Sequence, residues 1–201
     1  MTKRQGLLDE TDYSIIKTVR LPKRVVNLIE KIAMEENKKF NTVVTEELER
    51  YVYFTHRVRK FSKGNDVLMS DRFFELILDC LTDNTELIKE KAFKAGKQWG
   101  KEYLLLWGKE INTNKYSKYK ELKYFIAFLD LISKYSNLFR LDIIENIDSI
   151  DIIIYHNYNY KYSLLLMHYY MGFLENITDI KKKNLSMEPK DKSLIISYIF
   201  L

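Results

Sequence analysis

The side chains that could do catalytic chemistry are few and widely separated in this chain of 201 residues. The three histidines, His56, His156 and His168, stand apart and form no metal-ligand spacing with the single cysteine, Cys80. The sequence also lacks a glycine-rich phosphate-binding loop and a nucleophile elbow. We therefore expect no enzyme activity, no metal site and no cofactor.

The most unusual polar stretch runs from His156 to Ser163, where an expected strand meets an expected helix. Free N–H groups at a helix start bind anions, so His156, Asn157, Tyr162 and Ser163 are candidate residues of a pocket for a small-molecule effector. The stretch resembles the His-x-x-Gly-x-x-Trp-Ser junction of uncharacterised archaeal regulators, with Asn159 and Tyr162 replacing Gly and Trp. The alternative is a capped helix with packed tyrosines and no ligand.

A second region of interest, residues 14–56, reads as one strand followed by two helices. Residues 14–21 are rich in β-branched side chains and alternate as a half-buried strand does, and Pro22 ends the strand. A first apolar stripe then recurs at helical spacing: Val25, Leu28, Ile29, Ile32 and Ala33. Residues 37–39 interrupt the helix, and a second stripe follows: Val44, Leu48, Tyr51, Val52 and Thr55. These elements are too small to bury their apolar surface alone, which favours a pair of copies with antiparallel strands.

The order and lengths of these elements, with Thr18-Val19-Arg20-Leu21-Pro22 at the strand end, resemble the ribbon-helix-helix DNA-binding domain of the Arc and MetJ class. The resemblance implies a homodimer whose paired strands enter the major groove of double-stranded DNA. Because side chains alternate, Val19 and Leu21 would face the dimer core. Ile16, Thr18 and Arg20 would then face the bases.

The same resemblance implies a phosphate site at the start of the second helix. We assign phosphate contacts to Lys39, Asn41 and Lys23. The chain departs from the family pattern here: Asn37 replaces the usual turn Gly, Lys39 replaces the usual cap Ser, and Asn41 is an alternative cap. Lys17 also stands where the family has an apolar residue. The alternative is that this β-α-α segment is a fragment of a larger core and Arg20 an ordinary surface residue.

The distribution of charge agrees with the assignment to DNA. Residues 1–63 contain 14 Lys and Arg against 9 Asp and Glu, whereas residues 64–201 contain 19 of each, so the whole net charge of +5 lies in the first segment. One cysteine excludes an intramolecular disulfide and fits a reducing compartment. With no signal-like opening and no long apolar run, we expect a cytoplasmic protein that does not enter the membrane.

The remaining sequence predicts a second domain of order α-α-α-β-β-α-β, and so an α+β chain. Periodicity places helices over 70–81, 85–106, 119–135 and 161–177, strands over 139–143, 150–154 and 193–201, and a basic loop over 181–184. The second of these helices is expected to bury a stripe of Ile88, Ala92, Ala95, Trp99, Tyr103 and Leu106. Gly96 and Gly100 would let another element approach it closely. Trp99 and Trp107 are assigned to the core, with ligand stacking as the alternative.

We therefore interpret the chain as a flexible arm (1–13), a ribbon-helix-helix domain (14–56), a linker (57–66) and a C-terminal domain for oligomerisation or ligand sensing (67–201). The expected function is sequence-specific transcription regulation by a homodimer, or by a higher oligomer built from it. The alternative is an antitoxin that regulates its own operon. A long, folded-looking second domain argues against that alternative, and an enzyme tethered to DNA is disfavoured by the lack of clustered acids and bases.

Overall fold

The computed structural model describes residues 17–56, 58–59, 69–80, 85–107, 113–136, 138–177, 180 and 182–200, with the side chains of 105–107, 120 and 182 excepted. The chain divides into two compact units, Met1–Glu49 and Arg50–Leu201, which we call the N-terminal and C-terminal units. The division falls within the predicted ribbon-helix-helix segment. We describe each unit by itself.

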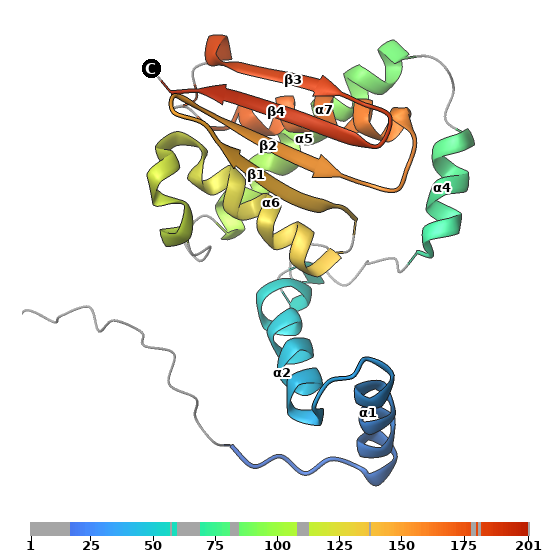
Figure 1. Ribbon diagram of the computed structural model, residues 1–201. Coiled ribbons are helices and arrows are strands. Elements are labelled where there is room, and N and C mark those ends of the chain that lie inside the picture. The colour runs from blue at the N-terminus through green and yellow to red at the C-terminus, as the bar shows by residue number, and fades with distance from the viewer. Residues whose placement is uncertain are drawn as a thin grey trace, which may run out of the picture. The chain divides into compact units, whose positions relative to one another are not determined.

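Two helices joined by a tight turn make up the described part of the N-terminal unit. Helix α1 spans Lys23–Glu35 and α2 spans Phe40–Arg50. Pro22 caps the start of α1, and its carbonyl accepts hydrogen bonds from the N–H groups of Val25 and Val26. Residues 17–22 lead into α1 without regular secondary structure (Figure 1), and residues 14–16 lie outside the described residues. A ribbon strand obtains its ladder from a second copy, so the β-α-α arrangement stays a prediction for this single chain.

The turn between the helices places Asn37 in the left-handed region, with φ of 52°. The N–H of Lys38 donates to the Ala33 carbonyl at 2.8 Å, and the N–H of Asn37 donates to the Met34 carbonyl at 3.2 Å. This is the Schellman hydrogen-bond pattern that ends many helices. The pattern needs a residue in the left-handed conformation, which Gly adopts most readily and Asn tolerates better than most other residues. The predicted break after α1 is confirmed.

The helical backbone does not stop at the end of α2. A π-helical turn covers Tyr51–Thr55, and residues 56, 58 and 59 are also helical. Within the C-terminal unit the Phe54 ring stacks on Tyr135 at 6.1 Å, and Val58 packs against the core. Two residues of the predicted linker are therefore helical, while residues 57 and 60–66 lie outside the described part.

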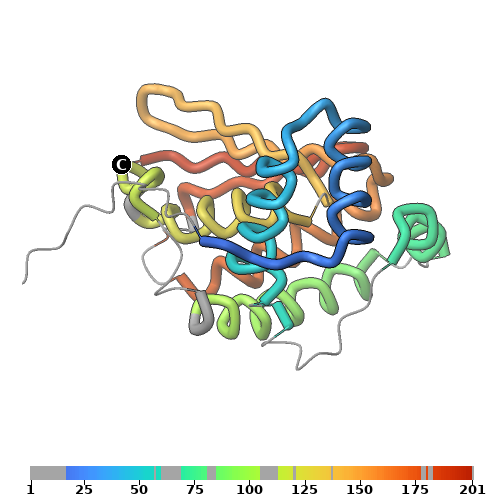
Figure 2. Tube along the Cα trace, turned by 90° about the horizontal axis from the view of Figure 1, so that it is seen from below, coloured from blue at the N-terminus to red at the C-terminus, as the bar shows by residue number. Residues whose placement is uncertain are grey.

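The C-terminal unit combines helices with one antiparallel sheet, which confirms the α+β class. Its elements are α4 (Asp71–Cys80), α5 (Thr85–Trp107), the 3₁₀ helix η2 (Asn114–Leu122), α6 (Lys123–Ser136), β1 (Arg140–Glu145), β2 (Ser149–Tyr155), α7 (Tyr160–Leu174), the 3₁₀ turn η3 (Lys182–Asn184), β3 (Leu185–Pro189) and β4 (Ser193–Ile199). The sheet order is β1-β2-β4-β3. The loop of the β1–β2 hairpin, light orange in Figure 2, projects beyond the sheet and carries the fully exposed Ile147.

The predicted order lacked strand β3, which is a correction. Its five residues follow a run of lysines and end at Pro189, so the segment resembles a loop in sequence. Proline is tolerated on an edge strand, and β3 is the edge strand beside β4. Part of the predicted basic loop is likewise a 3₁₀ turn, at Lys182–Asn184.

The core lies between one face of the sheet and the helices α5, α6 and α7, as Figure 1 shows. Alternate side chains of β2 and β4 point into it and are essentially inaccessible: Ile150, Ile152, Ile154, Leu194, Ile196 and Tyr198. Phe125 of α6 and Phe173 of α7 meet them from the helical side. In sequence, β2 was predictable from the alternation of Ile150, Ile152 and Ile154 with Asp151, and β4 from its richness in Ile and aromatic residues.

Helices α5 and α7 pack closely because each has a glycine that faces the backbone of the other helix. A Cβ on Gly96 would lie 1.9 Å from the Tyr169 carbonyl oxygen, and a Cβ on Gly172 would lie 2.1 Å from the Phe93 oxygen. The predicted close approach at Gly96 is confirmed, but the predicted stripe is wrong at Trp99, which is 47% exposed. The buried face follows Ile88, Ala92, Gly96 and Gly100, so Trp99 lies at its edge. The Trp107 side chain lies outside the described residues.

Candidate nucleic-acid interface and effector junction

The most basic stretch of the N-terminal unit begins with its first described residues. Residues 17–24 contain four cations, Lys17, Arg20, Lys23 and Arg24, and no acidic residue. All eight residues are exposed, Thr18 and Arg20 among them. Two of the three predicted base-reading residues are therefore accessible to a ligand. The third, Ile16, lies outside the described residues.

Several large apolar side chains among the described residues of the same unit are exposed. Val19 is 71% exposed and Leu21 is 40% exposed, and on α1 Leu28 is 54% exposed. Ala33 and Val43 are the only side chains of α1 and α2 that are buried in this described unit. Exposed large apolar side chains on a small unit are consistent with a surface that another chain covers.

The two adjacent lysines before α2, Lys38 and Lys39, differ in their contacts. Lys38 donates to Glu46 at 2.8 Å and pairs with Glu36 at 2.9 Å. Both contacts raise the pKa of Lys38, and the hydrogen bond to Glu46 contributes most. Lys39 is exposed and forms no ion pair with another described residue. Lys38 therefore ties the turn to α2, whereas Lys39 stays available to a partner.

Lys39 occupies the N-cap position, since its carbonyl accepts from the N–H groups of Thr42 and Val43 at 3.0 and 3.2 Å. The helix begins at Phe40, so Asn41 lies inside its first turn. The first N–H groups of a helix have no partner within the helix, and they favour an anion together with the helix dipole. Lys23, the other predicted phosphate contact, is the exposed first residue of α1.

The His156–Ser163 junction of the C-terminal unit is packed rather than open. His156 and Ser163 are buried, and Nε2 of His156 shares a 2.7 Å hydrogen bond with Oγ of Ser163. The Tyr162 ring meets the His156 ring edge-on at 4.8 Å. Burial lowers the pKa of His156, and the backbone of Tyr158 opposes that shift in part. Asn159 caps α7 by accepting from the N–H of Tyr162.

Helix α4 closes over this junction with two hydrogen bonds. The Tyr158 hydroxyl donates to Asp71 at 2.6 Å, and Asn159 donates to Asp79 at 2.9 Å. Burial, together with the bond to Asp71, raises the pKa of Tyr158 to about 12. The Phe74 ring also meets Tyr158 edge-on at 4.9 Å. These contacts hold the junction as a capped helix start with packed tyrosines.

A polar cavity of about 460 Å³ lies beside the junction and includes half of the predicted pocket. Its lining is Ser133, Leu138, Phe139, Arg140, Tyr155, His156 and Asn157. Tyr162 and Ser163 are not part of this lining. Sequence reasoning missed Arg140, which lies over the Tyr155 ring at 4.8 Å because β1 and β2 pair these two residues. Only the strand register brings Arg140 to the cavity, and no local sequence signal marks it.

Among the described residues, no group of three or more His, Cys, Asp or Glu side chains could hold a metal ion. No helix in that part of the chain is long and apolar enough to cross a membrane. The chain matches no protein-family model, no curated protein and no solved structure.

Proposed function

We propose that the protein is a sequence-specific, double-stranded DNA-binding transcription regulator that acts as a homodimer. The observation that carries this proposal is the exposed, alternating segment 17–21, whose apolar side chains Val19 and Leu21 are 71% and 40% exposed. Pairing two such segments antiparallel would bury those side chains between the copies. The opposite side of the ribbon would then present Thr18 and Arg20.

The charges around that segment match the surface of DNA. A two-stranded ribbon fits the major groove, where Arg20 can donate two hydrogen bonds to guanine and Thr18 can bond to a base edge. Ile16 would contact a thymine methyl group. Lys39 and the free N–H groups at the start of α2 would hold a phosphate, with Asn41 and Lys23 beside it. Basic residues concentrated in residues 1–63 supply the salt-dependent attraction.

Selection of duplexes from a random pool with the full chain tests the proposal. We expect enrichment of an inverted repeat, because a two-fold symmetric dimer reads two half-sites. We also expect affinity that falls steeply as salt rises. A pool that remains random after repeated rounds, with no salt-sensitive binding to any duplex, would contradict the proposed function.

The antitoxin alternative differs in what the C-terminal residues do. Residues 50–201 contain a packed core, with Phe125, Ile152 and Leu194 inaccessible to solvent. Such a core suits a sensing or assembly domain better than a segment that orders on a toxin. We therefore favour transcription regulation, with the C-terminal unit as its sensing or assembly part.

A further inference from the structure

Helix α4 of the C-terminal unit carries apolar side chains that face away from the core. Phe73, Leu76 and Ile77 are 54%, 55% and 38% exposed, and Cys80 is exposed as well. Their positions follow the i, i+3, i+4, i+7 rule, so they lie on one face of the helix. We call these four residues the α4 stripe. Exposed apolar side chains gathered on one helix face are consistent with a surface that another helix covers.

The orientation of α4 is fixed by contacts on its opposite side. Leu78 is buried in the core. The carboxylates of Asp71 and Asp79 accept hydrogen bonds from Tyr158 and Asn159, at 2.6 and 2.9 Å. The helix cannot turn its stripe inward without breaking these contacts. The α4 stripe is therefore available to a partner.

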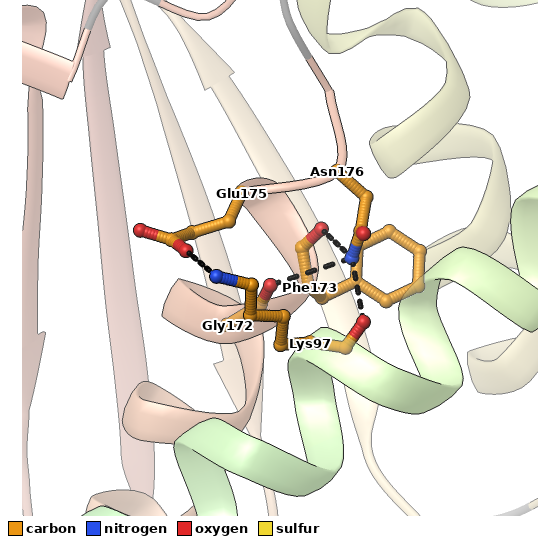
Figure 3. A network of polar contacts seen from close by, with 5 residues as sticks. All are labelled: Lys97, Gly172, Phe173, Glu175 and Asn176. Atoms are coloured by element: carbon orange, nitrogen blue, oxygen red, sulfur yellow. Dashed lines mark hydrogen bonds and ion pairs between the residues drawn. The ribbon is translucent and has the colours of Figure 1, made fainter.

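The contact between α5 and the end of α7 shows how a helix pair is completed inside this unit (Figure 3). Lys97 of α5 pairs with Glu175 at 3.0 Å, and Asn176 donates to the Lys97 carbonyl at 3.0 Å. A close seam is thus flanked by an ion pair between the two elements. On α4 a seam and a flanking cation are both present, but Arg72 is exposed and makes no ion pair with another described residue.

We infer that the α4 stripe binds the α4 stripe of a second copy of this chain, with the two helices antiparallel. Charge complementarity selects this partner and this orientation. Arg72 and Asp79 lie about two turns apart on the same flank of the stripe, and their midpoint, residues 75–76, falls within it. A two-fold axis at that midpoint places Arg72 of each copy beside Asp79 of the other. A parallel pair would instead place Arg72 beside Ser70 and Phe74, which carry no charge.

This pairing does not rest on the proposed function, since it needs neither DNA nor the ribbon. A ten-residue helix offers less area than a standard protein interface. We therefore expect the pairing to be weak between free chains and stable where another contact joins the copies. An anionic membrane surface fits the helix less well, because α4 also carries the carboxylates of Asp71, Glu75 and Asp79.

Oxidative cross-linking of the full chain tests the pairing. Leu76 lies beside the expected axis, where the Cα atoms of two packed helices approach to about 4–6 Å, a distance that a disulfide spans. The two native Cys80 residues would lie about 13 Å apart along the helices, which is too far. Leu76→Cys in a Cys80→Ser background should therefore form covalent dimers at least tenfold faster than the unsubstituted chain. The matched control is Glu75→Cys in the same background, which is exposed but faces away from the stripe and should stay slow.

Exchange of charges tests the orientation. In the Leu76→Cys background, Arg72→Glu alone or Asp79→Lys alone should slow cross-linking roughly fivefold, because each sets like charges beside each other. Co-expression of the two variants should restore the rate, since the mixed pair again has opposite charges at both positions. Damage to the fold from the lost Asn159 hydrogen bond would not be restored by mixing.

Equal cross-linking rates at Leu76→Cys, Glu75→Cys and native Cys80 would overturn the inference. A fast disulfide between native cysteines would also overturn it, because that bond requires a parallel pair, and so would co-expression that restores nothing. Duplex binding by the reduced Leu76→Cys chain separates the two proposals. Intact DNA binding without cross-linking removes only this inference, and cross-linking without DNA binding removes only the proposed function.

Discussion

At the scale of single residues, the pair Lys38 and Lys39 shows how neighbouring side chains of one type take different roles. Lys38 is held by Glu36 and Glu46, so it contributes to the turn between α1 and α2. Lys39 has no such partner among the described residues and stands at the N-cap of α2. The sequence shows that this turn is basic, but it does not show which of the two lysines forms ion pairs within the chain.

We predict that Lys39→Ala weakens binding to all duplexes alike. A lost phosphate contact removes counterion release, so the slope of log K against log salt should fall by roughly one for each contact. Fluorescence anisotropy at several salt concentrations measures that slope. The control Lys31→Ala, an exposed residue paired with Glu35, should leave it unchanged. A change in sequence preference in the Lys39 variant would show instead that Lys39 reads bases.

The buried His156 predicts how stability depends on pH. Burial lowers its pKa in the folded state, while an unfolded histidine titrates near pH 6.5. Below that pH the unfolded chain binds the extra proton, so the stabilisation is complete above pH 6.5 and is lost as the pH falls towards the folded-state pKa. We expect the free energy of unfolding to decrease by up to about 1.4 kcal/mol per pH unit in that window.

Urea denaturation between pH 5 and 8 measures this dependence. His156→Gln should reduce the slope, because glutamine does not titrate there and can still bond to Ser163. His168 has the same direction of shift and will retain part of the slope. The control His56→Gln changes an exposed histidine. A slope as large in His156→Gln as in the unsubstituted chain would contradict the assignment of a buried, neutral imidazole.

At the scale of elements, the contact between α5 and α7 depends on two glycines rather than on large side chains. We predict that Gly96→Ala lowers the free energy of unfolding by about 1–3 kcal/mol or more, because the new Cβ would meet the Tyr169 backbone carbonyl, which cannot rotate away. Thermal and urea unfolding measure the loss. Lys91→Ala, at an exposed position of the same helix, is the control and should change stability little. An equal stability of the two variants would mean that the helices lie farther apart.

Element positions were predictable where one face of an element is buried. Ile150, Ile152 and Ile154 of β2 alternate with Asp151, β4 is rich in Ile and aromatic residues, and the break after α1 is signalled by Asn37, which tolerates the left-handed conformation. Strand β3 was missed because a short edge strand ending in proline has the composition of a loop. Trp99 was misplaced because hydrophobicity suggested a buried tryptophan, whereas glycines define the buried face of α5.

The candidate sites were predictable to a smaller extent than the elements. His156 and Asn157 do line a cavity, but Arg140 joins them only through the register of β1 and β2. The assignment of base reading to Thr18 and Arg20 stays a prediction, which rests on alternation along one segment.

At the scale of the whole molecule, the proposed ribbon requires two copies of the chain. We predict that Val19 side chains of two chains meet across an antiparallel ribbon, where opposite Cα atoms lie about 4.5–5.5 Å apart. That spacing permits a disulfide, so Val19→Cys in a Cys80→Ser background should oxidise to a covalent dimer. Non-reducing electrophoresis detects it. Ile147→Cys, fully exposed on the β1–β2 hairpin, is the control. A folded monomer at micromolar concentration that does not cross-link through Val19 would exclude the ribbon.

The central claim is that the chain reads DNA sequence through Arg20, and one competition measurement tests it most directly. The affinity of the full chain and of Arg20→Ala would be compared on the selected duplex and on a random duplex at one salt concentration. We predict that Arg20→Ala loses about 1–3 kcal/mol on the selected duplex and almost nothing on the random one, because a guanidinium that bonds to guanine carries base readout. Equal losses on both duplexes would make Arg20 a phosphate contact and contradict the strand register, and no binding by either protein would contradict the account itself.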